Sequence, residues 1–256
     1  MLLTGLEVVL VKTRFPENIG MAARACANMG CPILRLVQPE RWDREKAAPL
    51  ATAQGLKILD GVTVHAHLSQ AVGHCSLVIG TTARVGGWRR SSLAPHAAAL
   101  AVATALQRGE CVSLVFGPED RGLNNDEVMH CPQLTTIPTD AAAHSLNLAQ
   151  AVLLMTYECA NAVRSLHDTA YVTARGQQYL EGKNVTSGGR KATAAEQERL
   201  MLEFKEMLLR LDYLHGDNPE YFLQPWRRLF GRCGLLRHEY DALMGLCRQV
   251  RNKIES

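Results

Sequence analysis

Short apolar runs alternate with helical patterns along the first two thirds of the chain. Residues 6–11, LEVVLV, are rich in β-branched residues, as expected for a strand buried on both faces. The other expected strands are 33–37, 62–64, 76–80, 112–116 and 134–137. Most of the segments between them have helical spacing of apolar residues, namely 19–29, 45–54, 68–72, 95–107 and 125–130. This order predicts an α/β fold with a mostly parallel sheet and helices on both faces.

The alternating pattern ends after one more long helix, which reaches about residue 166. The stretch 182–190 is polar, glycine-bearing and aperiodic, which is typical of a linker or loop. Helical spacing of apolar residues then returns at about residue 194. The chain is therefore expected to divide into an α/β domain over 1–168, a linker or mobile loop over 169–195 and a small helical extension over 196–256.

Composition excludes several classes of protein. Hydrophobic residues make up 47% of the chain and charged residues 21%, which is an ordinary balance for a chain with a buried core. No run approaches the roughly 18 apolar residues of a membrane helix, and the first residues lack the features of a signal peptide, so a cytoplasmic protein is expected. The eight cysteines show no Cys-x-x-Cys spacing, and no His pair lies near a Cys pair, so no metal site is expected.

Charge gives weak support for a nucleic-acid partner. The net charge is +3, and the whole excess lies in residues 171–256, which carry 14 Lys or Arg and 11 Asp or Glu. A loop with Trp88 among Arg84, Arg89 and Arg90 has the side chains that contact phosphates and bases, although it could also be a plain solvated loop.

Three polar blocks contain the candidate chemistry. They are residues 16–24 (PENIGMAAR), 116–123 (FGPEDRGL) and 145–149 (SLNLA). Each begins where an apolar run ends or just before a helical run begins. Because open α/β sheets bind ligands at the carboxyl ends of their strands, we expect the three blocks to form one pocket. The turn after the first strand, residues 12–20, is neither a GxGxxG turn nor a P-loop, which disfavours an ordinary dinucleotide-binding fold.

Most of these residues also allow a purely structural interpretation. Asn18 could simply cap a helix, and Arg24 could be an exposed arginine. However, Arg24 lies among small residues, where a guanidinium has to find an anion such as a phosphate or a ligand carboxylate. Glu119, between Gly117 and Gly122, could pair with Arg24 or accept a hydrogen bond from a ligand. The third block alone could do no more than cap the next helix.

Taken in this order, the three blocks resemble the motifs of the SPOUT superfamily of RNA methyltransferases, in its branch that methylates ribose 2′-hydroxyls. The resemblance covers about residues 6–166 and extends loosely to residues 226–230, WRRLF. Within this branch the chain is similar to bacterial enzymes that methylate cytidine or uridine 32 of tRNA. The resemblance implies a deep trefoil knot around residues 116–123 and 136–148, S-adenosylmethionine as cofactor, and a homodimer.

The resemblance also implies roles for single residues. The cofactor is expected to be surrounded by Thr81, Thr82, Ala83, Gly117, Gly122, Ile137, Ser145, Leu146 and Asn147. Catalytic roles are expected for Asn18, Arg24, Glu119, Ser145 and Asn147, with Arg24 acting near the cofactor of the other subunit. Independently of the resemblance, the basic side chains Arg84, Arg89, Arg90, Arg121, Arg227 and Arg228 are candidates for RNA contacts. For Arg121 the alternative is a solvated charge, and for Arg227 and Arg228 it is a helix that mainly packs a dimer. The expected reaction is methylation of a ribose 2′-hydroxyl, with tRNA nucleotide 32 as the first candidate. An rRNA enzyme of the same branch and a non-catalytic RNA-binding homologue remain open.

Overall fold

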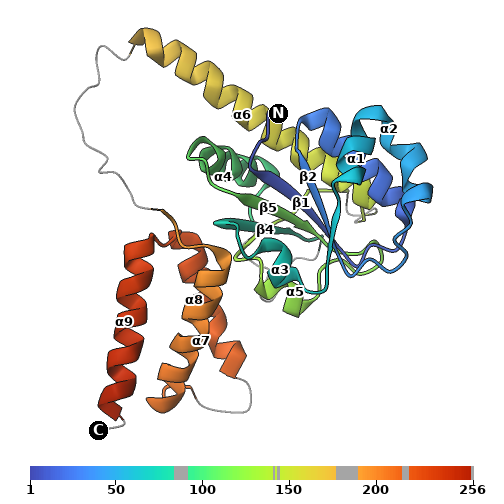
Figure 1. The fold of residues 1–256 in the computed structure, drawn as a ribbon. Helices are drawn as coiled ribbons and strands as arrows, with labels where there is room; N and C mark the ends of the chain where they lie inside the picture. The colour runs from blue at the N-terminus through green and yellow to red at the C-terminus, as the bar shows by residue number, and fades with distance from the viewer. Residues whose placement is uncertain (84–91, 141, 143–144, 177–189, 215–218, 255–256) are drawn as a thin grey trace.

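The computed structural model describes the chain except residues 84–91, 141, 143–144, 177–189, 215–218 and 255–256 (Figure 1). Its six strands form one sheet in which every neighbouring pair is parallel, in the order β3-β2-β1-β5-β4-β6. They are β1 (Leu6–Val11), β2 (Ile33–Val37), β3 (Thr63–His65), β4 (Leu77–Thr81), β5 (Val112–Phe116) and β6 (Gln133–Thr135). The expected parallel sheet is confirmed, with strand ends shifted by at most two residues.

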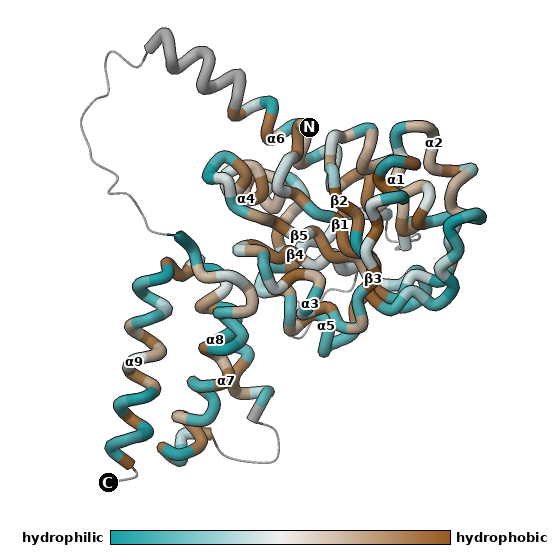
Figure 2. The backbone as a smooth tube through the Cα atoms, in the orientation of Figure 1, coloured by the Kyte–Doolittle hydropathy of each residue, from teal (hydrophilic) through white to brown (hydrophobic). Residues whose placement is uncertain are grey.

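Helices cover both faces of this sheet. One face packs against α1 (Pro16–Met29), α2 (Arg44–Asp60), α4 (Pro95–Gln107) and α6 (Leu148–Gly176), and the other against α3 (Leu68–Val72) and α5 (Asn125–Met129). In β1, Val8 and Leu10 join the first core, whereas Val9 and Val11 join the second, because successive side chains of a strand point to opposite faces. Figure 2 shows the resulting apolar colouring along the central strands.

Two glycines let α1 and α2 approach each other closely. A Cβ atom at Gly20 would lie 2.1 Å from the carbonyl oxygen of Ala47, and one at Gly55 would lie 3.1 Å from the backbone nitrogen of Arg24. The backbones are therefore in contact where the two helices cross, which fixes the position of α1 and of the site residues at its start.

Several helix boundaries differ from those expected, and α2 ends at Asp60 rather than near residue 54. Asn18 does not cap α1, because the helix begins at Pro16 and Phe15 occupies the N-cap position. Proline is favoured in the first turn, since it has no N–H to leave unpaired and its φ angle is already helical. At the other end of the domain, α6 continues to Gly176, past the expected end near residue 166.

Strand β6 lies between the two ends of the connection from β4 to α4, Thr82 and Leu93. On one side, the backbone nitrogen of Thr82 donates to the carbonyl oxygen of Thr135 at 3.0 Å. On the other side, Leu93 donates to Leu134 at 2.7 Å and accepts from the nitrogen of Thr136 at 3.2 Å. The segment that leaves β4 thus returns on the opposite side of β6, as the expected trefoil knot requires.

The C-terminal helices surround an apolar cluster of their own. These helices are α7 (Ala194–Arg210), α8 (Pro219–Cys233) and α9 (Arg237–Ile254). The cluster includes Phe204 and Phe230, whose ring centroids are 5.6 Å apart. Among the described residues, no helix has the length and apolar character needed to cross a membrane. The division of the chain at residues 168 and 195 stays a prediction.

Candidate active site at the carboxyl ends of the strands

The three polar blocks meet at the carboxyl ends of β1, β4, β5 and β6, where two neighbouring cavities open. The larger has a volume of about 670 Å³, and eight of the nine expected cofactor residues line it. These are Thr81, Thr82, Ala83, Gly117, Gly122, Ile137, Ser145 and Leu146. The smaller cavity, of about 450 Å³, is lined by Phe15, Glu17, Asn18, Glu119, Ser145, Leu146 and Asn147. Glu119, Ser145 and Leu146 line both cavities, so the two form one composite site.

The loop after β5 is shaped by its glycines. A Cβ atom at Gly117 would lie 2.2 Å from the backbone nitrogen of Leu123, so only glycine fits where the loop closes on itself. Gly122 has a φ angle of +61°, and its nitrogen donates to the carbonyl oxygen of Pro118 at 2.9 Å. This tight turn places Glu119 between the two cavities.

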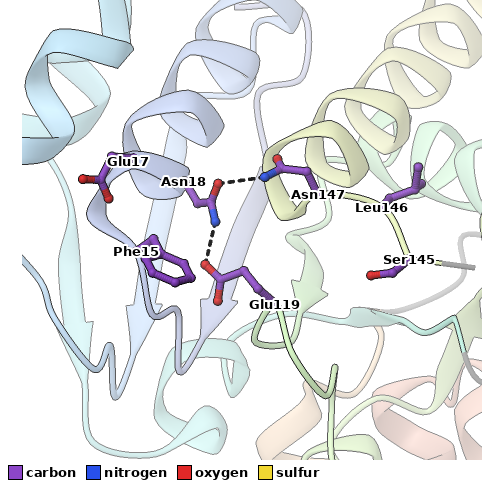
Figure 3. A pocket seen from close by; sticks show the side chains of 7 residues that line it. All are labelled: Phe15, Glu17, Asn18, Glu119, Ser145, Leu146 and Asn147. Carbon is purple, nitrogen blue, oxygen red and sulfur yellow. Dashed lines mark hydrogen bonds between the residues drawn. The ribbon is translucent and has the colours of Figure 1, made fainter. Parts of the chain in front are cut away.

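A chain of hydrogen bonds joins the three blocks through their side chains (Figure 3). The amide nitrogen Nδ2 of Asn147 donates to Oδ1 of Asn18 at 3.0 Å, and Nδ2 of Asn18 donates to Oε1 of Glu119 at 2.7 Å. The orientation of both amides follows from α6, because Oδ1 of Asn147 accepts from the backbone nitrogens of Ala149 and Gln150. A helix cap thus fixes the direction of the whole chain of bonds.

Glu119 also receives support from the start of α1. Its second oxygen, Oε2, accepts from the backbone nitrogen of Arg14 at 3.1 Å. The carboxylate therefore lies beside the first turn of α1, where the unpaired N–H groups of a helix favour negative charge. Within one chain Glu119 does not pair with Arg24, which corrects the first of its two expected roles. Because each carboxylate oxygen has two lone pairs, Glu119 can still accept a hydrogen bond from a ligand.

Arg24 lies apart from this site in a single chain. It lines neither cavity, its side chain is exposed, and it follows Asn18 by six residues, about 9 Å along the helix axis. Among the residues that the structure describes, none forms an ion pair or hydrogen bond with its guanidinium. One chain alone therefore does not bring Arg24 to the other candidate catalytic residues.

The candidate RNA-binding arginines are found in different surroundings. Arg121 is exposed at the edge of the larger cavity, with Glu40 and Asp120 within ion-pair distance. Arg227 lies on α8 and its charge is largely compensated, because its guanidinium pairs with Glu198. Arg228 is a half-exposed neighbour on the same helix. The remaining three, Arg84, Arg89 and Arg90, lie outside the described residues.

Sequence reasoning missed several residues that line the cavities. Phe15, exposed by 46%, lines the smaller cavity, and Thr139 lines the larger one. Each lies four residues after the end of a strand, β1 for Phe15 and β6 for Thr139, and this place in the chain was the signal that could have found them. Asp120, Leu148 and Ala151 also line the larger cavity.

Comparison with known proteins decides the family. Residues 5–157 match the model of the SpoU rRNA Methylase family. The chain belongs to this family. It is 35% identical over 253 residues to the tRNA (cytidine/uridine/adenosine-2′-O-)-methyltransferase TrmJ of Pseudomonas aeruginosa, covering 98% of this chain and 95% of that protein. Membership in the SpoU family confirms the resemblance, the methyltransferase class and the knotted fold.

Solved structures agree with this assignment along the whole chain. The crystal structure of TrmJ from Z. mobilis ZM4 superposes with a TM-score of 0.76 at 28% identity, covering 96% of this chain and 98% of that one. A probable methylase family protein from Haemophilus influenzae gives a TM-score of 0.60 at 28% identity, with 99% and 98% covered. Both likenesses include the C-terminal helices as well as the SpoU domain.

Proposed function

We propose that this protein transfers a methyl group from S-adenosylmethionine to a ribose 2′-hydroxyl of tRNA, with anticodon-loop nucleotide 32 as the target. The observation that carries the proposal is the composite site, in which a cofactor-sized cavity opens beside the chain of bonds from Asn147 to Glu119. The full-length likeness to a TrmJ named as a tRNA 2′-O-methyltransferase supports tRNA as the substrate.

The residues of the larger cavity fit S-adenosylmethionine. Its volume lies within the range of about 300–1,000 Å³ that is usual for ligand pockets. Ile137 and Leu146 offer apolar surface to an adenine ring, whereas the turns 81–83 and 117–122 offer backbone polar groups and hydroxyls. When bound, the cofactor supplies a methyl group made electrophilic by a positively charged sulfur.

The protein's own residues have to orient the ribose and manage its proton. Glu119 stands where both cavities meet and can accept a hydrogen bond from a ribose hydroxyl in the smaller one. Asn18, only 6% exposed, and Asn147 hold this carboxylate in place. An arginine is unsuited as a general base, because guanidinium groups as a class are too weakly acidic to give up a proton and so to become proton acceptors; Arg24 therefore needs another role. We assign Arg24 to binding the RNA phosphate next to the target ribose and to stabilising the alkoxide that develops on the 2′-oxygen. The proton of the 2′-hydroxyl then passes to phosphate or water.

Arg24 can reach such a position if two copies of the chain pair. Exposed apolar side chains on α6 support pairing: Leu153, Leu154 and Tyr157 are exposed by 38%, 42% and 48%. Large apolar side chains grouped on a surface are typical of interaction sites. Helix α6 packs against α1, so an interface on α6 would lie close to the helix that carries Arg24.

Arg24→Ala tests the proposed chemistry. The variant should lower methyl transfer to tRNA by about 100-fold or more, as when a group that stabilises developing negative charge is removed. Calorimetry should show cofactor affinity close to that of the parent protein. Arg108→Ala, an exposed arginine at the end of α4, is the control and should leave turnover unchanged.

The same assay separates the proposal from its alternatives. Total small RNA and rRNA from cells lacking the protein are incubated with labelled cofactor, and the methylated nucleotide is mapped. Label confined to rRNA would replace tRNA by rRNA as the substrate, and no cofactor binding at millimolar concentration would indicate an RNA-binding homologue. Full activity of Arg24→Ala would refute the role given to that residue.

A further inference from the structure

Four side chains with metal-binding atoms meet at the opposite edge of the sheet, where the strands begin. Glu7 lies near the start of β1, His74 and Cys75 precede β4, and Cys111 directly precedes β5. Their ligand atoms all lie within 4.8 Å of one another. The four residues are distant in sequence, but β1, β5 and β4 are neighbours whose first residues are level in the parallel register. Sequence spacing alone could not show this cluster.

The distances within the cluster are close to those of a tetrahedral metal site. The two sulfurs of Cys75 and Cys111 are 3.2 Å apart, Nε2 of His74 is 3.6 Å from the sulfur of Cys75, and the same nitrogen is 3.0 Å from Oε1 of Glu7. Around Zn²⁺ with its usual bond lengths, such pairs of ligand atoms are about 3.3–3.8 Å apart. These three contacts lie within about 0.6 Å of the tetrahedral values. The remaining ligand atoms, all within 4.8 Å of one another, would have to move closer together to surround the ion.

The neighbours of these ligands hold them in place. The guanidinium of Arg35 donates to both oxygens of Glu7, at 2.6 and 3.0 Å, and Oγ of Ser113 is 3.1 Å from the sulfur of Cys75. Ligating carboxylates and thiolates in metal sites are commonly hydrogen-bonded in this way. Two thiolates and one carboxylate would bring three negative charges, which Zn²⁺ and the Arg35 guanidinium would balance.

We propose that Glu7, His74, Cys75 and Cys111 form a structural zinc site. Thiolate and imidazole ligands in a tetrahedral arrangement select Zn²⁺ over harder ions such as Mg²⁺ or Ca²⁺. Four protein ligands leave no open position for a substrate, which is the pattern of a structural rather than a catalytic zinc ion. Glu7 is 3% exposed, whereas the His74 side chain is 45% exposed and leaves a route for the ion from solvent.

The site lies where the C-terminal helices attach to the sheet domain. The carbonyl oxygen of Cys75 accepts from the nitrogen of Ala194 at 2.7 Å, and that of Gly73 accepts from Ala195 at 3.0 Å. Lys191 adds an ion pair of 3.2 Å to Glu110, next to Cys111. A bound ion would therefore fix the loop against which α7 begins.

Metal binding by the full-length protein tests the proposal. The reduced protein is freed of metal with a chelator and titrated with Zn²⁺ against a chromophoric competitor, and separately with Co²⁺. We expect one equivalent per chain, the visible absorption of tetrahedral thiolate-bound cobalt, and a higher melting temperature with zinc. Loss of a hydrogen-bond partner of a metal ligand lowers metal affinity by about 10- to 100-fold. Cys111→Ser and His74→Ala remove a ligand itself, so each should lower zinc affinity by more than that. Cys233→Ser, at an exposed cysteine, should keep the full equivalent.

A measurement on the parent protein keeps the test decisive if a variant does not fold. Zinc should protect Cys75 and Cys111 from alkylation, as read by peptide mass spectrometry, and leave Cys233 reactive. No zinc binding by the parent protein would overturn the proposal, as would equal binding by Cys111→Ser. A disulfide between Cys75 and Cys111 in freshly purified, metal-free protein would also overturn it, in favour of a redox pair.

Discussion

The side chain of Asn147 both caps α6 and forms a hydrogen bond within the candidate active site. Its oxygen caps α6 by accepting from Ala149 and Gln150, and its nitrogen donates to Asn18. The residue is exposed on the rim of the smaller cavity, and because the cap holds its oxygen, its nitrogen is left to donate to Asn18. The side chain that caps the helix thereby also orients the groups proposed to hold the ribose.

The two tasks of Asn147 can be separated by substitution. Asn147→Asp keeps the capping oxygen but cannot donate to Asn18, so it should unfold in urea close to the parent protein and yet lose most methyl transfer. Asn147→Ala loses the cap as well and should cost about 1 kcal/mol of stability in addition. Single-turnover kinetics and urea titration check both variants. Equal stability of the two would show that the cap contributes nothing, and parental turnover in Asn147→Asp would disconnect the hydrogen bond from catalysis.

At the scale of elements, the start of α7 combines a cap with ion pairs. Thr193 and Glu196 form a capping box, and Glu196 also pairs with Arg190 and Arg237. The hydrogen bond from Arg190 is the main reason that the pKa of Glu196 falls to about 2, with burial opposing the shift. Since the folded protein binds this proton more weakly than the unfolded chain, the interaction stabilises the fold above the ordinary pKa of 4.5 and is lost as pH falls toward 2.

Glu196→Gln should reveal this pH dependence. Glutamine keeps an oxygen for the Thr193 nitrogen but removes the charge, so the variant should be less stable than the parent protein near neutral pH. The difference between the two urea midpoints should shrink between about pH 4.5 and pH 2. Glu206→Gln, at an exposed position on the same helix, should show no such convergence. A difference that stays constant down to pH 2 would contradict the ion-pair explanation.

The pattern of apolar and polar residues predicted which helices and strands form better than it predicted where they end or how the strands are ordered in the sheet. Alternation of apolar runs was enough for the parallel sheet, since strands buried on both faces need no partner information to be recognised. The start of α1 was missed because Pro16 favours the first turn more strongly than Asn18 favours a cap. The three blocks were found as sequence, but their hydrogen bonds depend on how α1, the 117–123 turn and α6 pack, which local pattern does not contain.

At the scale of the whole molecule, the two ends of the parallel strands hold two separate groups of candidate functional residues. The carboxyl ends of the strands hold the proposed methyl-transfer site, and the amino ends hold the four side chains proposed to bind zinc and the attachment of the C-terminal helices. Strand order produces the second cluster and could not be foreseen from residue spacing. The proposed role of Arg24 requires more than the fold of one chain, since it needs a second copy of the chain.

Mixing two inactive variants tests whether the site is shared between copies. Arg24→Ala and Glu119→Gln are expected to be inactive alone for different reasons. If Arg24 acts in the partner's site, a mixed dimer contains one site with both native residues, so mixing should restore up to about half of the turnover per such dimer. Sedimentation velocity checks that dimers form, and a mixture of Arg24→Ala with itself is the control. Dimers that exchange subunits but recover no activity would place Arg24 and Glu119 in the same chain's site.

The passage of β6 between Thr82 and Leu93 has a consequence for the lifetime of the folded state. The larger cavity is walled both by residues 81–83, at one end of that connection, and by Ile137 and Ser145, which lie on the segment after β6. A molecule bound there would contact both the β4–α4 connection and the segment that follows β6. S-adenosylmethionine would have to dissociate before the knot could untie. The cofactor would therefore also slow unfolding of the knotted chain.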